Sequence, residues 1–319
     1  MAEKILVIGA CGQVGTELVE NLQSMHGSAN VIASDIRTSD NPVFANGIFE
    51  TLDVLDKTQI AEVFGKYKPT IVYHLAALLS ATAEANPKFG WELNMDGTFN
   101  IFDACLEYKV QRIFWPSSIA VFGPTTPKVN TPQSTILEPN TIYGITKLAG
   151  ERYCEYYNQR YGLDVRSIRY PGLIGWKSLP GGGTTDYAVD IFHQALKTGS
   201  YECFLNAGTT LPMMHMEDAV RATLEITNAA SNSIKIRSSY NISGVSFNPE
   251  ILSAEIKKHI PSFEISYVAD SRQKIADSWP QSINDLQARQ DWDWQEKYNL
   301  EKLVSNMLEN LKSEVLKSN

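Results

Sequence analysis

The sequence predicts an α/β protein with a doubly wound parallel sheet over residues 1–170 and a smaller α/β lobe over residues 171–319. Short apolar runs alternate with segments of helical periodicity through the first half, as in sheets whose two faces are covered by crossover helices. The length of 319 residues suits one large α/β domain with a smaller companion. We expect some segments of the second half to return and pack on the first domain.

The first strand and helix are predicted on either side of a glycine-rich turn. The apolar run 5–8 leads into Gly9, and apolar residues recur at helical spacing after the turn. Gly9 suits a tight turn, Gly12 lets the backbone approach a pyrophosphate, and Gly15 lets the helix lie against the sheet. The start of the helix would present free N–H groups to phosphates. The cofactor contacts expected at this turn are Gly9, Gly12, Gln13 and Val14.

The second strand supports a dinucleotide at this turn. The apolar run 31–34 ends in Asp35, about twenty residues after the glycines, where a carboxylate can bind the adenosine ribose hydroxyls. Because a carboxylate would repel a 2′-phosphate, Asp35 favours NAD over NADP. The nearby Arg37, also expected to contact the cofactor, keeps NADP as an alternative. A plain βαβ turn without a ligand is the other alternative.

Two further strands are expected over 47–52 and 70–75, with a helix between them. Asp53 follows the first of these strands, where it either bonds the adenine amino group or is an ordinary loop residue. Small residues after the second strand would let the backbone approach the cofactor. The cofactor contacts expected here are Asp53, Val54, Leu75, Ala76 and Ala77.

Composition argues against several classes of protein. The net charge is −8 and the basic residues are scattered, which argues against a surface for nucleic acid or anionic membrane. No apolar run approaches the roughly twenty residues of a membrane span, and the first strand begins too close to Met1 for a targeting peptide. A cytoplasmic enzyme is the simplest expectation. The four cysteines and five histidines lack ligand spacing, so no metal site is expected.

A long amphipathic helix is predicted over 88–108, with Asn94 in its interior. Asparagine is mildly unfavourable inside a helix, so Asn94 either makes a hydrogen bond near the cofactor or faces solvent. We count it among the expected cofactor contacts. The next strand, over 112–115, runs into Pro-Ser-Ser and places Ser118 at the carboxyl edge of the sheet, where ligands bind.

The catalytic signal is a tyrosine and a lysine on one face of a predicted helix. Lys147 follows Tyr143 by four positions, so both side chains point the same way. A tyrosine is a poor base at neutral pH unless an ammonium close by favours the phenolate, which is what Lys147 would do. Lys147 can also hold the nicotinamide ribose, and Ser118 can bond the substrate oxygen. An exposed helical pair without catalytic function is the alternative.

Several motifs together resemble those of the extended short-chain dehydrogenase/reductases, in their nucleotide-sugar epimerase branch. They are Gly9-x-x-Gly12-x-x-Gly15, His74-Leu75-Ala76-Ala77, Ser117-Ser118, Tyr143-x-x-x-Lys147 and Arg169-Tyr170-Pro171-Gly172. The resemblance covers nearly the whole chain. It implies a Rossmann NAD-binding domain with Ser118, Tyr143 and Lys147 as catalytic residues. It also implies Tyr170 as a wall of the nicotinamide pocket, and a homodimer packed through the helices after Lys88 and around Tyr143.

The second half of the chain bears on the substrate. Members of the family that bind nucleotide sugars usually carry Arg-Asp-Tyr where this chain reads 211–218 without an arginine. Few basic residues stand between Pro171 and that segment, so two phosphates would be poorly held. A small substrate is therefore expected, with no nucleic acid or membrane partner.

The glycine-rich stretch 180–188 indicates which small substrate. Its hydroxyls, N–H groups and carboxylate could bind an amino acid zwitterion. A helix start capped by Thr184 or Thr185 is an alternative, and both can be true at the same time. The stretch resembles the epimerase-type L-threonine 3-dehydrogenases, which also implies a substrate contact for Ser80. The substrate contacts expected are Ser80, Ser118, Tyr143, Thr184, Thr185 and Asp186.

The reaction expected from these residues is NAD-dependent oxidation of the β-hydroxyl of L-threonine to 2-amino-3-oxobutanoate. Two alternatives stay open. One is a nucleotide-sugar epimerase or dehydratase of the same architecture. The other is a non-catalytic NAD-sensing protein, which would have no need for Ser118, Tyr143 and Lys147 together.

Overall fold

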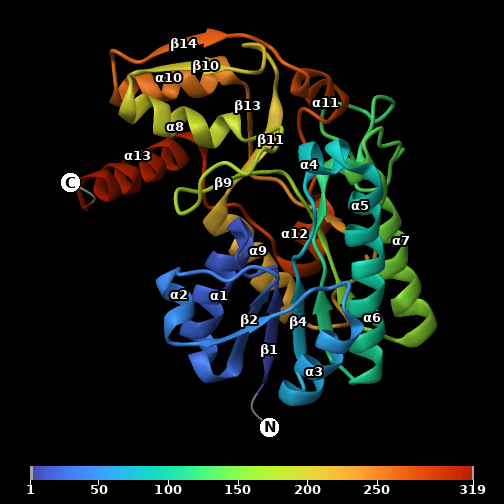
Figure 1. Cartoon of the computed structure of the whole chain (residues 1–319). Helices are drawn as coiled ribbons and strands as arrows, with labels where there is room; N and C mark the ends of the chain where they lie inside the picture. The colour runs from blue at the N-terminus through green and yellow to red at the C-terminus, as the bar shows by residue number, and fades with distance from the viewer. Residues whose placement is uncertain (1–2, 318–319) are drawn as a thin grey trace.

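The computed structural model describes residues 3–317, and its centre is a six-stranded sheet in which every neighbouring pair of strands is parallel (Figure 1). The strand order is β3-β2-β1-β4-β5-β7. The strands are β1 Ile5–Ile8, β2 Val31–Asp35, β3 Ile48–Thr51, β4 Ile71–His74, β5 Arg112–Phe114 and β7 Val165–Arg166. Because β2 and β4 flank β1, the strand order reverses beside β1, and ligands bind at the carboxyl ends of strands at such a point.

Helices cover both faces of this sheet. Successive side chains of β1 point to opposite faces and are buried in two different cores. Ile5 and Val7 belong to the core shared with α1 and α9, whereas Leu6 and Ile8 belong to the core shared with α3, α6 and α7. The helices concerned are α1 Gln13–His26, α3 Lys57–Tyr67, α6 Gly97–Glu107, α7 Ile142–Tyr161 and α9 Met216–Asn228. The predicted doubly wound α/β fold is confirmed.

Two predicted elements are divided in the structure. The helix expected over 88–108 consists of α5 Pro87–Trp91, the π-helical segment η2 Glu92–Asp96, and α6. The strand expected over 112–115 ends at Phe114, and Ser117–Ser118 form a separate strand, β6. β6 pairs with β8 Ile168–Tyr170, which in turn pairs with β12 Tyr240–Asn241. Short helices α2 Pro42–Ala45 and α4 Ser80–Ala85 complete this part of the chain.

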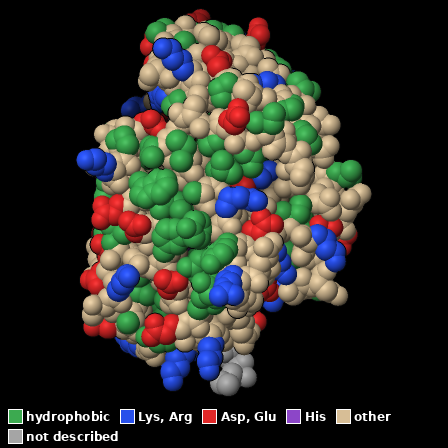
Figure 2. Space-filling view, turned by 90° about the vertical axis from the view of Figure 1, so that its right-hand side faces the viewer, with side chains coloured by type: hydrophobic (Ala, Val, Ile, Leu, Met, Phe, Trp, Pro, Cys, Tyr) green, Lys and Arg blue, Asp and Glu red, His purple; other side chains and the backbone are tan. Residues whose placement is uncertain are grey.

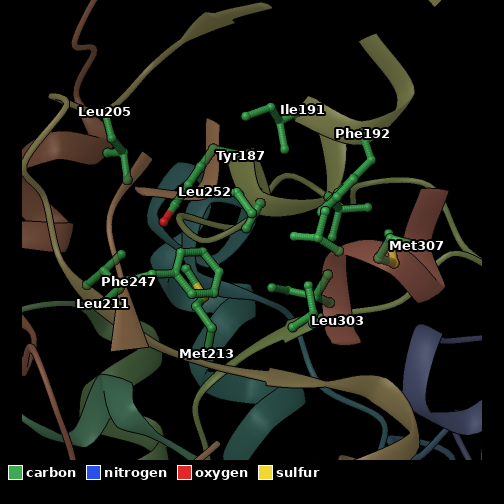
Figure 3. Packing of buried hydrophobic residues seen from close by; sticks show 14 of the residues in the cluster. Tyr187, Ile191, Phe192, Leu205, Leu211, Met213, Phe247, Leu252, Leu303 and Met307 are labelled. Atoms are coloured by element: carbon green, nitrogen blue, oxygen red, sulfur yellow. The ribbon is translucent and has the colours of Figure 1, made fainter. Parts of the chain in front are cut away.

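The second half of the chain forms a lobe around a further core, which also includes residues 119–122 of the first half (Figure 3). Tyr187 and Phe192 of α8 pack with Leu252 of α10 and with Leu303 and Met307 of α13. Its helices are α8 Tyr187–Lys197, α10 Pro249–His259, α11 Arg272–Ser278 and α13 Leu300–Lys317. Its strands are β9 Gly172–Ile174, β11 Leu211–His215 and β13 Val245–Phe247 in one sheet, and β10 Ser200–Cys203 and β14 Glu264–Tyr267 in another.

Parts of the second half pack on the first domain instead of on this lobe. α9 lies beside α1, and Trp292 of α12 Leu286–Trp292 is buried in the same core as Ile5 and Val7 of β1. The two parts therefore share a boundary at the carboxyl ends of the central strands (Figure 1). Within residues 3–317, no helix has the length and apolar character needed to cross a membrane.

The structure predicts a specific cost for a side chain at Gly15. A Cβ there would lie 2.3 Å from the carbonyl oxygen of Gly9 and 2.8 Å from Cα of Ala10, both of them backbone atoms that cannot move aside. Gly15→Ala should therefore lower the free energy of unfolding by about 1–3 kcal/mol. Urea unfolding followed by circular dichroism measures this. Gly208→Ala, where a Cβ would meet nothing within 4 Å, is the control and should change little.

Candidate active site

A cleft of about 320 Å³ lies at the carboxyl ends of the central strands and is closed on its far side by the loop between β9 and α8. Residues from both halves of the chain line it. Of the predicted site residues, those that line it are Gly9, Gly12, Gln13, Val14, Arg37, Leu75, Ala77, Ser80, Ser118, Tyr143, Lys147, Tyr170, Thr184, Thr185 and Asp186. Asp35, Asp53, Val54, Ala76 and Asn94 do not line it.

The glycine-rich turn has the features that a dinucleotide requires. Gly9 has a φ of 85°, and a Cβ there would lie 2.6 Å from the backbone nitrogen of Ala76, so a side chain is excluded. α1 begins at Gln13, and no side chain caps its first turn. Its first N–H groups therefore remain available to phosphate oxygens.

Asp35 lies at the end of β2, beside this turn. Its carboxylate accepts hydrogen bonds from the backbone N–H of Cys11 and of Arg37, each at 3.0 Å. These bonds orient the carboxylate at the edge of the turn, where the sequence predicts the ribose. Asp53 accepts a hydrogen bond from the backbone N–H of Leu55 at 2.9 Å and lies in the turn after β3.

Asn94 is buried inside the protein, which excludes the solvent-facing alternative. Its Oδ1 accepts a hydrogen bond from the backbone N–H of Leu78 at 2.7 Å, and its Nδ2 donates to the carbonyl of Leu78 at 3.1 Å and to Oγ1 of Thr146 at 3.2 Å. The side chain therefore fastens the loop after β4 to α7. Its place in the π-helical segment, not in a regular helix, was not predicted.

Tyr143 and Ser118 are brought together by a close contact between backbones. Thr141 caps α7 by accepting a hydrogen bond from the backbone N–H of Gly144 at 3.1 Å. A Cβ at Gly144 would lie 2.2 Å from the carbonyl oxygen of Ala120, in the short helix η3 Ile119–Val121 that directly follows Ser118. This packing puts the Tyr143 hydroxyl within hydrogen-bonding reach of Ser118.

Lys147 lies one turn further along α7, with its ammonium buried. Its Nζ donates to the carbonyl of Pro116 at 2.7 Å and lies 4.5 Å from the ring centre of Trp115 and 5.6 Å from that of Tyr143. The carbonyl and the two aromatic faces replace some of the hydration that burial removes. The alternative of an exposed helical pair is therefore excluded.

Burial moves the pKa values of these two groups apart, because it disfavours the charged form of each. Burial raises the pKa of Tyr143 to about 12, while its hydrogen bond with Ser118 acts in the opposite direction. Burial lowers the pKa of Lys147 to about 8, against the opposing effects of Cys154 and Glu151. Lys147 therefore still holds its proton at neutral pH, and its charge favours loss of the proton from Tyr143.

The loop before α8 arranges the predicted substrate residues. The carboxylate of Asp186 accepts hydrogen bonds from the backbone N–H groups of Gly182 at 2.7 Å and Gly183 at 2.8 Å. The alternative in which Thr184 or Thr185 caps the helix is excluded, since Asp186 directly precedes α8 and no side chain caps it. Thr184 lines the cleft, and its hydroxyl is buried and has no hydrogen-bond partner within the described part of the protein.

Other residues of the site were not predicted from the sequence. Pro116, Leu79 and Trp279 also line the cleft. Trp279 follows α11, far along the chain, and nothing local in the sequence connects it to the site. Glu151 does not line the cleft but lies behind it, four positions after Lys147, so the same helical spacing that indicated Lys147 could have identified it.

The profile of the NAD dependent epimerase/dehydratase family matches residues 5–243. The chain belongs to this family. It is 47% identical over 309 residues to an uncharacterized epimerase/dehydratase of Staphylococcus saprophyticus, covering 96% of each chain. The NAD cofactor and the short-chain dehydrogenase/reductase fold predicted from the sequence are thereby confirmed.

Two solved structures are similar over nearly their whole length. The holo form of a GalE-like L-threonine dehydrogenase from Cupriavidus necator is 48% identical, with a TM-score of 0.95, and the match covers 97% of this chain and 99% of that one. A monomeric L-threonine 3-dehydrogenase from a metagenome is also 48% identical, with a TM-score of 0.93 and the same coverage.

A buried carboxylate beneath the cleft loop gives a prediction about pH. Glu17 of α1 lies against Gly175, and burial raises its pKa to about 7, with the nearby Glu217 adding to the effect of burial and Lys177 opposing it. The same loop is fastened to α1 by a hydrogen bond from Nε2 of Gln13 to the carbonyl of Leu179 at 3.0 Å.

Because the folded state holds the proton of Glu17 more tightly than the unfolded state, ionisation of Glu17 destabilises the fold as the pH rises through about 7. Glu17→Gln should therefore raise the free energy of unfolding by about 1–3 kcal/mol at pH 8, with a gain that shrinks as the pH falls towards 5. Urea titrations at several pH values measure it. The exposed Glu62→Gln is the control, and an equal gain at both pH values for Glu17→Gln would contradict the assignment.

Proposed function

We propose that this protein oxidises the β-hydroxyl of L-threonine with NAD, giving 2-amino-3-oxobutanoate, NADH and a proton. The observation that carries the proposal is the cleft that Ser118, Tyr143 and Lys147 share with Thr184, whose buried hydroxyl has no hydrogen-bond partner in the described residues. The similarity to L-threonine dehydrogenases along nearly the whole chain supports it.

In this proposal, Tyr143 is the base. It removes the proton of the β-hydroxyl while the buried ammonium of Lys147 stabilises the phenolate that this requires. Ser118 donates a hydrogen bond to the substrate oxygen and keeps it within reach of Tyr143. NAD, when bound, supplies the ring that accepts the hydride from the β-carbon. The glycine-rich turn, Asp35 and Asp53 would bind its phosphates, ribose and adenine.

The amino acid end of the substrate would be held by the loop before α8 together with Ser80. The hydroxyls of Thr184 and Thr185 suit a carboxylate as hydrogen-bond donors. Asp186 uses one carboxylate oxygen for two backbone N–H groups, which leaves its other oxygen to accept from an ammonium. A buried hydroxyl without a partner costs free energy, and a bound carboxylate would remove that cost.

A nucleotide-sugar epimerase or dehydratase is the second candidate, because the family includes both activities in its description. Between 211 and 218 the chain has no arginine, and the cleft offers few cations for a diphosphate. Accumulation of NADH with L-threonine, and none with a UDP-sugar, separates the two.

We also propose that the protein is a cytoplasmic homodimer, packed through α5 and α7. Exposed apolar and aromatic side chains gather on the face of the molecule that carries α5, α6 and α7 (Figure 2). They include Phe89, Trp91, Ile145, Tyr153, Tyr156 and Tyr161. Single exposed apolar residues are common on protein surfaces, whereas a contiguous patch marks an interaction site. Contact with a second copy of the chain would remove this patch from water. The similar metagenome enzyme is described as monomeric, so the dimer needs its own test.

Tyr143→Phe removes only the hydroxyl of the proposed base. We expect kcat for L-threonine to fall by about 10³-fold, since general base catalysis contributes this much, while NAD binding changes little. NADH formation followed by absorbance, together with NAD binding by calorimetry, measures both. Tyr108→Phe, on the far side of the domain, is the control. Turnover that persists in Tyr143→Phe would rule out the assignment.

Thr184→Val keeps the shape of the side chain and removes its hydroxyl. KM for L-threonine should rise about tenfold, the equivalent of one hydrogen bond, with a smaller effect on kcat. Thr184→Ser, which retains the hydroxyl, should restore most of the affinity. Equal KM values for the valine and serine variants would show that the hydroxyl does not bind substrate.

Sedimentation of the wild-type protein should give twice the chain mass. The double variant Trp91→Glu and Tyr156→Glu should sediment as a monomer, because two charges would be buried at the contact between copies. Leu286→Glu, an exposed apolar residue of α12, is the matched control and should leave the dimer intact. A wild-type protein that sediments as a monomer would refute this arrangement.

A further inference from the structure

A fully buried ion pair lies directly behind the catalytic groups. Glu151 of α7 and Arg169 of β8 are 0% and 3% exposed. Nε of Arg169 donates to Oε1 of Glu151 and Nη2 donates to Oε2, both at 2.8 Å, which is a bidentate arrangement. Neither residue lines the cleft, so neither touches substrate or cofactor.

The pair connects the elements that carry the catalytic groups. The hydroxyl of Ser117 donates to Oε1 of Glu151 at 2.6 Å, and Ser117 precedes the catalytic Ser118 on β6. In the pairing of β6 with β8, Ser117 lies opposite Arg169 and Ser118 lies opposite Tyr170. One carboxylate therefore joins α7, β6 and β8.

The far side of Arg169 is fastened as well. Its Nη1 donates to Oδ1 of Asn241 at 3.0 Å and to the carbonyl of Gln133 at 3.2 Å. Asn241 in turn donates to the carbonyls of Thr131 and Asn284, each at 3.2 Å. The guanidinium is thus held in one orientation by the loop before α7 and by β12.

Stability alone does not account for such a pair. Removing two charges from water costs about as much as their attraction returns, so a buried ion pair is often no more stabilising than apolar residues of the same size. Its advantage is that it allows only one relative arrangement of the elements it joins. Here those elements deliver Ser118, Tyr143, Lys147 and Tyr170 to the cleft.

We propose that Glu151 is a positioning residue for the reaction: through Ser117 and Arg169 it fixes β6 and β8 against α7, and from one turn beyond Lys147 it favours the ammonium form of that lysine. The inference rests on the proposed roles of Tyr143 and Lys147. It extends them by giving a physical reason why a buried lysine keeps its proton.

The groups that act on Lys147 come from several elements. On α7 they are Tyr143, Glu151 and Cys154. From β4, the buried His74 faces Lys147 as a neutral ring, because burial lowers the pKa of His74 to about 3. From β8, Arg169 brings a positive charge next to Glu151. Among these, Glu151 is the carboxylate, held in an ion pair by Arg169. Its removal would leave Arg169 unopposed and would disfavour a second positive charge on Lys147.

The test measures the ionisation of Lys147 directly, without reference to any substrate. Lysine labelled with ¹³C at Cε is followed by NMR as a function of pH, and the Lys147 signal is the one absent from Lys147→Met. The variants are Glu151→Gln, Glu151→Gln combined with Arg169→Met, and Ser117→Ala. Glu155→Gln, which removes a carboxylate one turn further along α7, is the matched control.

We expect the titration midpoint of the Lys147 signal to fall by about one pH unit in Glu151→Gln, because an opposite charge nearby is lost. In the double variant this midpoint should return towards the wild-type value. In Glu151→Gln, kcat should fall by about 10²-fold through misplacement of the catalytic groups, with NAD affinity unchanged. Ser117→Ala should lower kcat without moving the midpoint, and Glu155→Gln should change neither.

A midpoint in Glu151→Gln equal to that of the wild type would overturn the electrostatic part, and a double variant with wild-type kcat would overturn the positioning part. If Glu151→Gln does not fold, the double variant and Ser117→Ala test the positioning role instead, because neither variant leaves a buried charge unpaired. Lowered kcat with wild-type NAD affinity then supports the proposal, and unchanged kcat in both contradicts it. A wild-type protein that does not oxidise L-threonine would refute the proposed function, while the midpoint of Lys147 would still decide this inference.

Discussion

The site depends on the close approach of α7 to the turn that follows Ser118. Gly144 lies so near Ala120 that even a methyl group would overlap its carbonyl oxygen. This contact fixes the distance between α7 and the end of strand β6. Tyr143 precedes Gly144 and Ser118 precedes η3, so one backbone contact brings together the two hydroxyls on which the proposed chemistry depends.

Burial of charge is the second constraint. Lys147 has lost most of its contact with water, and its ammonium is held by a carbonyl, two aromatic rings and the field of Glu151. An environment of this kind costs folding free energy and strengthens electrostatic interactions within the cleft. The same exclusion of water that raises the pKa of Tyr143 therefore makes the neighbouring positive charge more effective in lowering it.

The parts of the structure that follow from local rules could be predicted from the sequence. The glycine turn, the strand ending in Asp35 and the helical spacing of Tyr143 and Lys147 each depend on residues close together in the chain. The π-helical turn around Asn94 could not be predicted, because it depends on bonds to Leu78 and Thr146, which only the folded chain brings near. The separate strand β6 and the position of Trp279 depend on distant segments in the same way.

The central claim is that the dinucleotide held by the first glycine turn reaches Tyr143 in the same cleft as the substrate. A crystal structure of the protein with NAD and L-threonine tests this most directly. We expect the β-carbon of the substrate to lie between the nicotinamide ring and Tyr143, with its hydroxyl bonded to Tyr143 and Ser118. A nicotinamide ring bound away from Tyr143, or a substrate hydroxyl that faces neither side chain, would contradict it.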